Sequence, residues 1–216
     1  MEAQHGNVKA SIIQAAGRLF VDRGYHSTTI RDICAEAGVN LAAVNYHFGD
    51  KKSLYVAVIN HYKDNAFKKF PLDHGIREGD SPPSKITSFV YAMVLRMFDK
   101  DSELPFGKLL VRELIEPTGE LDHLIRDIFR PSFLKLSSLV REILGETATD
   151  QTVFLCSMSI VGQCLHFRHS PRLISRLNKK KRFSSKDIQS LADHISRFSL
   201  AALENYVPPK STSPKG

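Results

Sequence analysis

One segment, residues 28–54, constrains the fold of this chain more than any other. Its pattern predicts two short helices joined by a tight corner at Ala37-Gly38-Val39. Gly38 stands where the chain must turn sharply, and we expect a side chain there to crowd the crossing helices. The second helix ends in Tyr46-His47-Phe48 and is followed by lysines. A corner of this kind is typical of a helix-turn-helix, which presents its second helix to the DNA major groove.

Capping residues mark the ends of these short helices. Thr29 and Asp32 have the spacing of a capping box, with Asp in place of the usual Glu. Asn40 is placed to cap the second helix of the motif, and Asp50 is placed to cap the helix that follows. Gly24 is a natural C-terminal cap for a preceding helix over residues 8–23.

A hydrophobic skeleton supports the motif and predicts a three-helix core. An ordinary helical hairpin within a bundle is the alternative, because a glycine turn alone does not exclude it. The skeleton residues are Phe20, Ile30, Ile33, Cys34, Ala37, Val39, Val44, Phe48 and Leu54.

The rest of the chain also has helical periodicity, and strand signals are scarce, so the fold class is predicted to be all-α. Residues 73–83 are rich in Gly, Pro, Asp and Ser and indicate a flexible connection. Pro131 is predicted either to separate two helices or only to kink a continuous one. The further helices are expected at about 51–70, 84–99, 106–116, 119–129, 131–145, 150–169 and 184–206.

Composition indicates a globular protein that stays in the cytoplasm. Of the 216 residues, 42% are hydrophobic and 25% are charged, and no apolar run has the length of a membrane helix. The N-terminus lacks the apolar core of a signal peptide. Three widely spaced cysteines, Cys34, Cys156 and Cys164, are expected to be reduced thiols.

The net charge of +7 is not by itself an indication of DNA binding. Most of the excess lies in residues 171–216, around the basic run 178–182, which we expect to be a solvated loop.

Residues 8–56 resemble the DNA-binding domain of TetR-family transcriptional regulators. The resemblance is carried by Thr28-Thr29, by the corner Ile33-Cys34-Ala35-Glu36-Ala37-Gly38-Val39, by Tyr46-His47-Phe48 and by Asp50-Lys51-Lys52-Ser53-Leu54. It implies an N-terminal DNA-binding domain over residues 1–56, with the helix-turn-helix at about 29–48. A ligand-binding and dimerisation domain would then occupy residues 57–207. The last residues, 208–216, have the composition of a disordered tail.

The resemblance also implies DNA contacts, taken over position by position. Hydroxyls of Thr28 and Thr29 would meet phosphates at a helix N-terminus, and Lys51 would clamp the backbone. Tyr46 and His47 match phosphate-contacting positions at the end of the recognition helix. Bases would be read near the cap residue Asn40 by Leu41, Ala42, Ala43 and Asn45, with Arg31 reaching in from the preceding helix.

Two positions depart from the family pattern. Asn45 stands where the family often has Tyr, and Ala43 stands where it often has a polar residue. Asn can pair with adenine through two hydrogen bonds, and Leu and Ala methyl groups can pack on thymine methyls. The departure therefore favours an A/T-leaning half-site.

The C-terminal part is expected to receive a ligand, and residues 84–170 resemble the CecR-like subgroup of the family. Met and Phe side chains suit an adaptable apolar pocket, although the same stripe at helical spacing is more often ordinary core. The apolar candidates are Phe89, Met93, Met97, Phe106, Leu110, Phe129, Phe133, Met158 and Phe167, and the polar anchors are Arg112, Glu113, Gln163 and His166.

Two late helices, at about 150–169 and 184–206, are expected to form the interface of a homodimer. The resulting hypothesis is a dimeric repressor that binds a palindromic operator in double-stranded DNA and is released by an unidentified small-molecule effector. This hypothesis includes no membrane partner. The expected interface contacts are Phe154, Met158, Val161, Leu191, Ile195, Phe198, Leu200 and Leu203.

Other readings remain open beside this one. Glu120 and His123 have the Glu-x-x-His spacing of helical di-iron enzymes, but the second pair that such a site needs is not evident. His166 and His169, with Cys164 nearby, could form part of a metal-sensing site, although zinc needs three or four ligands. A helical interaction module that has lost DNA binding is the third alternative. We expect no enzyme activity, cofactor or metal.

Overall fold

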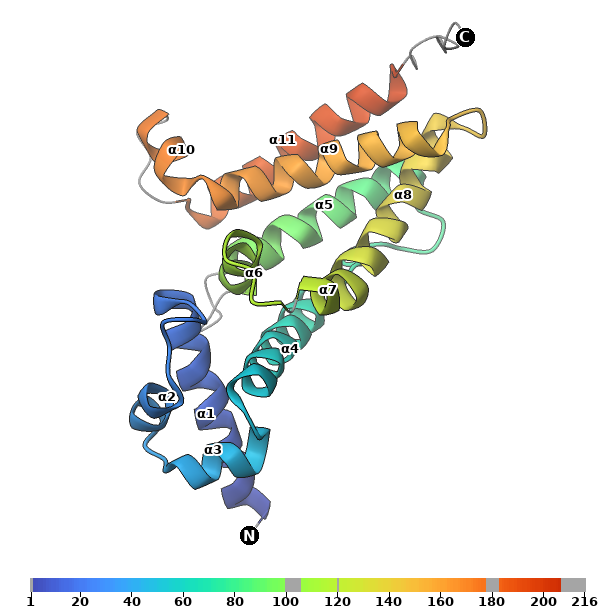
Figure 1. The fold of residues 1–216 in the computed structure, drawn as a ribbon. Helices are drawn as coiled ribbons and strands as arrows, with labels where there is room; N and C mark the ends of the chain where they lie inside the picture. The colour runs from blue at the N-terminus through green and yellow to red at the C-terminus, as the bar shows by residue number, and fades with distance from the viewer. Residues whose placement is uncertain (1, 100–105, 120, 178–182, 207–216) are drawn as a thin grey trace, which may run out of the picture. The chain divides into compact units, whose positions relative to one another are not determined.

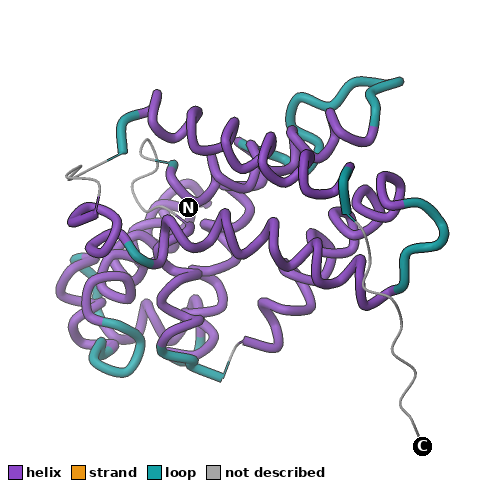
Figure 2. Tube along the Cα trace, turned by 90° about the horizontal axis from the view of Figure 1, so that it is seen from above, coloured by secondary structure: helices purple, strands orange, loops and turns teal. Residues whose placement is uncertain are grey.

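The computed structural model describes residues 2–99, 106–119, 121–177 and 183–206. Within these ranges all regular secondary structure is helical, as Figure 2 shows, so the predicted all-α fold class is confirmed. The basic run at 178–182 and the tail at 208–216 lie outside the described residues. No helix among the described residues has the length and apolar character needed to cross a membrane.

The described chain forms two compact units. Unit 1 comprises the residues up to Pro71 together with Leu95–Asp127, and unit 2 comprises Leu72–Val94 and the chain from Ile128 onward. The predicted boundary after residue 56 falls inside a helix, and the division into domains 1–56 and 57–207 stays a prediction.

Unit 1 is built mainly from five helices (Figure 1). α1 contacts α2, α3, α4 and α6, and α4 contacts α3 and α6. The fifth helix of the chain begins in unit 2, and its last turn from Leu95 belongs to unit 1. The bounds are α1 Glu2–Arg23, α2 Ile30–Ala37, α3 Leu41–Phe48, α4 Lys51–Lys69, α5 Pro82–Phe98 and α6 Phe106–Ile115.

The core of the helix-turn-helix lies where α1 to α4 meet. Ile33, Val44 and Leu54 are completely buried, and Phe20 packs edge-on against Tyr55 with ring centroids 5.0 Å apart. The remaining skeleton residues Ile30, Cys34, Ala37, Val39 and Phe48 are only half-buried. The three-helix core is therefore narrower than the sequence pattern predicts.

The predicted helix caps are confirmed. Thr29 and Asp32 form a reciprocal capping box at the start of α2, and the side chains of Asn40 and Asp50 accept backbone N–H groups at the starts of α3 and α4. Gly38 has the left-handed φ of +67° that favours glycine. A Cβ on Gly38 would meet no atom within 4 Å, so the predicted crowding is wrong and only the backbone conformation requires glycine.

The helix before Pro131 continues through it. α7 (Leu121–Leu124), a π-helical turn (Ile125–Phe129) and α8 (Arg130–Leu144) follow one another without a break. Proline has no N–H to donate and clashes with the carbonyl four residues back, and the widened turn just before it relieves both conflicts. The structure therefore supports the alternative in which Pro131 does not separate two helices.

Unit 2 is a bundle in which α8, α9 (Asp150–His169) and α11 (Ser185–Glu204) contact one another. α9 and α11 run in opposite directions in Figure 1. α10 (Pro171–Leu177) packs on α9 and was not expected from the sequence, where Pro171 reads as a break although proline also favours the first turn of a helix.

The structure corrects part of the expected dimer contacts. Leu191, Ile195 and Leu203 are buried inside the protomer and therefore cannot contact a second copy. Val161 and Leu200 are half-buried, whereas Phe154, Met158 and Phe198 are exposed.

Candidate nucleic-acid interface

One face of α3 is open to solvent. Leu41 is 51% exposed, and Ala42 and Asn45 are exposed beside it, whereas Val44 points inward and is completely buried. These exposed positions recur at the spacing of one helical turn, so they share a face. Ala43 is half-buried next to them. The structure thus brings the predicted base-reading residues together on a helix that is anchored from its opposite side.

The cap of α3 fixes where this face begins. Asn40 is exposed, and its side-chain oxygen accepts the backbone N–H of Ala43 at 2.9 Å. That hydrogen bond satisfies one of the unpaired donors in the first turn of the helix. Asn40 therefore orients α3 through its cap.

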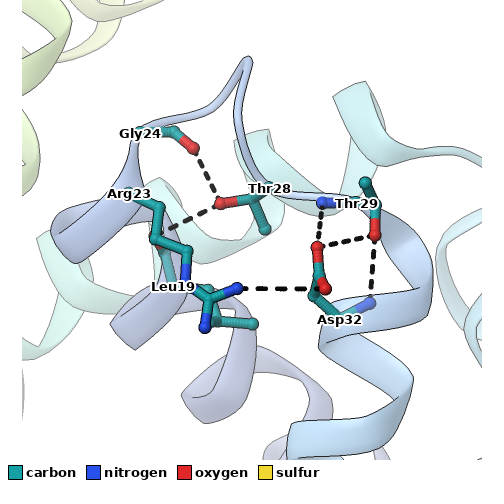
Figure 3. A network of polar contacts seen from close by, with 6 residues as sticks. All are labelled: Leu19, Arg23, Gly24, Thr28, Thr29 and Asp32. Carbon is teal, nitrogen blue, oxygen red and sulfur yellow. Dashed lines mark hydrogen bonds and ion pairs between the residues drawn. The ribbon is translucent and has the colours of Figure 1, made fainter.

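Two neighbouring threonines have opposite environments (Figure 3). Thr28 is completely buried, and its hydroxyl lies 2.7 Å from the carbonyl oxygen of Gly24 and 3.2 Å from that of Leu19. The structure therefore corrects the expectation for Thr28, whose hydroxyl satisfies carbonyls at the end of α1 and does not face solvent. Thr29 is exposed and retains the predicted position.

The first turn of α2 is held by a compact polar network around Asp32 (Figure 3). The Asp32 carboxylate accepts the Thr29 hydroxyl at 2.6 Å and the Thr29 backbone N–H at 2.9 Å, and it lies 3.8 Å from Arg23. These hydrogen bonds from Thr29, aided by Arg23, lower the pKa of Asp32. The network sets the start of α2, on which the exposed Arg31 stands.

Lys51 and Tyr46 are two further residues that are predicted to contact phosphates. Lys51 opens α4, and its ammonium group lies over the ring of Tyr25, 4.4 Å from the centroid. Partial burial lowers the pKa of Lys51. Tyr46 is 76% exposed and contacts the ring of the half-buried His47. Both aromatic residues lie at the end of α3, as the resemblance implies.

Sequence reasoning missed a polar connection between α6 and the DNA-binding helices. The hydroxyl of Tyr55 on α4 donates to the Glu113 carboxylate at 2.7 Å, and Thr118 donates its N–H and hydroxyl to the other oxygen at 2.9 and 3.1 Å. Glu113 is completely buried. Burial, together with the Glu113 carboxylate, raises the pKa of Tyr55 and keeps the phenol neutral. Both carboxylate oxygens of Glu113 therefore already have protein partners.

Arg112, the neighbouring candidate anchor, also contacts the protein. Its guanidinium donates to the carbonyl oxygen of Val21 on α1 at 3.4 Å and pairs with Glu116 at 3.1 Å. Arg112 and Glu113 were predicted as ligand anchors, but here they connect α6 to α1 and α4. No local sequence pattern identifies such partners, since they lie tens of residues apart in the chain.

The remaining ligand candidates do not all fall in one unit. Met97, Phe106 and Leu110 are buried in unit 1, together with Arg112 and Glu113. In unit 2, Phe89 is buried, whereas Met158 and His166 are exposed. The ligand-binding role of these residues stays a prediction. The other members of unit 2 are half-buried: Met93, Phe129, Phe133, Gln163 and Phe167.

The alternative metal sites gain no support from the part of the chain that the structure describes. Within it, no group of three or more His, Cys, Asp or Glu side chains is arranged to hold a metal ion. Glu120, one half of the Glu-x-x-His pair, lies outside the described residues.

An anchored helix with an open polar and apolar face, preceded by a capped helix and a left-handed glycine, defines a helix-turn-helix DNA-binding protein. Residues 12–58 match the bacterial regulatory proteins of the tetR family, and residues 82–203 match the C-terminal domain of the HTH-type transcriptional dual regulator CecR. The chain belongs to the TetR family of transcriptional regulators and has a CecR-type C-terminal domain. The family resemblance and the regulator function, as opposed to an enzyme, are thereby confirmed.

Individual relatives agree with this assignment. The chain is 27% identical over 168 residues to the HTH-type transcriptional dual regulator CecR of Shigella flexneri. This alignment covers 74% of this chain and 75% of that protein. It is 50% identical over 54 residues to an HTH-type transcriptional repressor of Mycobacterium tuberculosis, covering 25% and 29% of the two chains. The structure of AibR in complex with isovaleryl coenzyme A and operator DNA has the same fold, with a TM-score of 0.66, 19% identity and coverage of 88% and 97%.

Proposed function

We propose that this TetR-family regulator is a dimeric repressor whose α3 reads a palindromic operator and whose affinity for that operator is lowered by a small-molecule effector. The observation that carries the proposal is the open face of α3. Leu41 and Asn45 are exposed there, while the buried Val44 holds the helix against its own core. A helix presented in this way can enter the major groove without unfolding any part of the protein.

Phosphate contacts would position this helix on the duplex, and base contacts would give specificity. Three side chains supply suitable groups: a hydroxyl from Thr29 at the start of α2, a phenol from Tyr46 near the end of α3, and a cation from Lys51 at the start of α4. Asn45 can pair with adenine, and the methyl groups of Leu41 and Ala42 can pack on thymine methyls. An A/T-leaning half-site follows from these side chains.

The dimer is supported by a set of exposed apolar residues, most of them on the helices expected to form it. Its members are large, lie on neighbouring helices of unit 2 and recur at helical spacing, which is unusual for a surface that stays wet. A twofold dimer would place two α3 helices about 34–36 Å apart, on successive major-groove faces. On the expected helices these residues are Phe154, Leu155 and Met158 of α9 and Phe198 of α11, and Leu134 is exposed on α8, which contacts both.

Effector control is supported by the contacts that α6 makes with the DNA-binding helices. Glu113 bonds to Tyr55 of α4, and Arg112 bonds to Val21 of α1. A ligand that favours another position of α6 would therefore act on both helices that carry α2 and α3. It lowers operator affinity only through a difference in its own affinity for the two states. AibR, which shares the fold, was solved with isovaleryl coenzyme A and operator DNA together.

The proposal is tested by fluorescence anisotropy with a labelled duplex from the promoter of the protein's own gene. Asn45→Ala should weaken binding about tenfold or more and relax the preference at one base pair, because a bidentate contact is lost. Asn65→Ala, which removes an exposed asparagine from α4, is the matched control and should bind like the wild type. Equal binding by Asn45→Ala and the wild type, or selection of G/C-only half-sites from random DNA, would contradict the proposed reading face.

A further inference from the structure

A guanidinium is buried in unit 1 outside the DNA-binding face. Arg96 stands in the last turn of α5 and is only 5% exposed. Arginine is almost never buried to this extent unless it is paired with an anion. The groups around Arg96 therefore decide how its charge is stabilised.

These surroundings are aromatic and apolar. The guanidinium carbon of Arg96 lies over the ring of Phe67, 4.4 Å from its centroid, and Phe67 packs edge-on against Phe106 at 6.4 Å. Met97 and Phe106 are both buried. Gly107 approaches Met97 so closely that an added Cβ would lie 2.7 Å from the Met97 carbonyl oxygen. The start of α6 and the end of α5 are thus in tight contact next to the charge.

The described residues, which do not include 100–105, offer this charge little compensation. Among the described residues, Arg96 forms one hydrogen bond, to the carbonyl oxygen of Phe70, and no Asp or Glu pairs with it. The acidic residue nearest in sequence, Asp99, pairs with Lys69 at 2.7 Å. Phe70 caps the C-terminus of α4, where the helix dipole supplies only about half a negative charge. A guanidinium has five N–H donors, and the described residues accept a hydrogen bond from one nitrogen of Arg96.

Arg96 nevertheless remains a cation at neutral pH. Burial lowers its pKa to about 10, well below the usual arginine range but still above physiological pH. Among the described residues, the Phe67 ring and one neutral carbonyl are what face this cation, and an anion that pairs with it in two parallel hydrogen bonds would offset more of its desolvation.

We propose that Arg96 binds the carboxylate of an amphipathic small-molecule effector, whose apolar part lies against the Phe67–Phe106 cluster. The proposal rests on the effector control proposed above and names the chemical class of the effector. Arginine suits the task because its planar fork matches a carboxylate with two parallel hydrogen bonds. Three predicted ligand residues of the same unit, Met97, Phe106 and Leu110, are buried and apolar, as the tail of such a molecule requires.

The site also provides a route to the operator. A carboxylate bound to Arg96 would draw the guanidinium toward itself and so change the hydrogen bond that links Arg96 to the Phe70 carbonyl at the end of α4. The opposite end of α4 begins at Lys51, which is predicted to clamp a phosphate. α4 also carries Tyr55, the partner of Glu113 on α6. A change at one end of α4 is thus transmitted along a single helix to the DNA-binding face.

The test compares acids with their uncharged amides by isothermal titration calorimetry on the full chain. The probes are octanoate against octanamide and 4-phenylbutyrate against 4-phenylbutyramide, at a pH well above the carboxyl pKa. For at least one pair, the acid should bind the wild type about tenfold or more tightly than the amide, the size expected for a charge-assisted contact. Arg96→Met should abolish this difference, and Arg96→Lys should keep part of it. Arg77→Met, which removes an exposed arginine, should leave it unchanged.

Equal affinity of acid and amide in both pairs, or no binding of either acid, would overturn the proposal. Loss of the hydrogen bond to the Phe70 carbonyl could unfold Arg96→Met. The comparison of acid and amide on the wild type needs no variant. Operator binding is measured on the same preparation without ligand. A protein that binds its operator but does not distinguish acid from amide refutes only the role of Arg96. A protein that does not bind the operator refutes the proposed function, and the comparison still decides whether Arg96 is an anion site.

Discussion

At Thr28 and Thr29, two identical side chains next to each other have different tasks. The Thr28 hydroxyl is buried against the carbonyls of Leu19 and Gly24, whereas Thr29 is exposed at the start of α2. A buried hydroxyl contributes to stability through hydrogen bonds that water cannot replace. The exposed Thr29 hydroxyl donates to the Asp32 carboxylate and accepts the Asp32 N–H, so its contact with a phosphate would require it to leave part of this capping box. Residue type alone therefore does not identify which threonine meets DNA.

This difference gives a prediction for stability. Thr28→Val keeps the shape of the side chain but leaves two buried carbonyls without the hydroxyl, which should cost about 1–3 kcal/mol of unfolding free energy. Urea denaturation measures that loss. Operator affinity of the folded variant should be unchanged, and Ser27→Ala, at an exposed neighbouring position, should change neither quantity. A large loss of operator affinity in Thr28→Val with full stability would restore Thr28 as a phosphate contact.

The short helices α2 and α3 have eight residues each, so their caps matter more than they would in long helices. Caps and turns are local, which explains why Thr29, Asn40 and Asp50 were identified from the sequence. The partners of Glu113 and Arg96 were not, because Tyr55 and Phe70 come from distant parts of the chain. Burial of Leu191 and Ile195 was also missed, since an apolar helix face does not reveal whether it meets its own bundle or a second copy.

The capping box of α2 should make stability depend on acid. Hydrogen bonds lower the pKa of Asp32 in the folded protein below its unfolded value near 3.8. The stabilisation is therefore fully present above that unfolded value and is lost as the pH falls through the lower folded pKa. The unfolding free energy of the wild type should fall more between pH 6 and pH 3 than that of Asp32→Asn.

Asp64→Asn is the matched control, because Asp64 is exposed on α4 and caps no helix. It should keep the steep fall of the wild type, as measured by denaturation at a series of pH values. The same fall in Asp32→Asn would show that the capping box does not contribute to acid sensitivity.

For the molecule as a whole, the proposed dimer would place two DNA-binding faces on a palindromic site. The exposed apolar residues of α9 and α11 are the structural reason to expect it, and Phe198 is the most exposed of them at 59%. Phe198→Asp places a charge among these exposed apolar residues. It should raise the dimer dissociation constant about tenfold or more, as sedimentation equilibrium would show. Ile115→Asp, at an exposed apolar position of α6, should remain dimeric. A wild type that is monomeric at all concentrations would refute the interface.

The central claim is that α3, presented twice by a dimer, recognises an operator. The most direct measurement is the affinity for the promoter duplex and for a scrambled duplex, titrated over a series of KCl concentrations. We predict two protomers per duplex and tighter binding to the promoter at every salt concentration. The logarithm of the affinity should fall against the logarithm of salt with a slope of about −4 or steeper, as several neutralised phosphates require. Equal affinity for both duplexes, or affinity that does not depend on salt, would contradict the account.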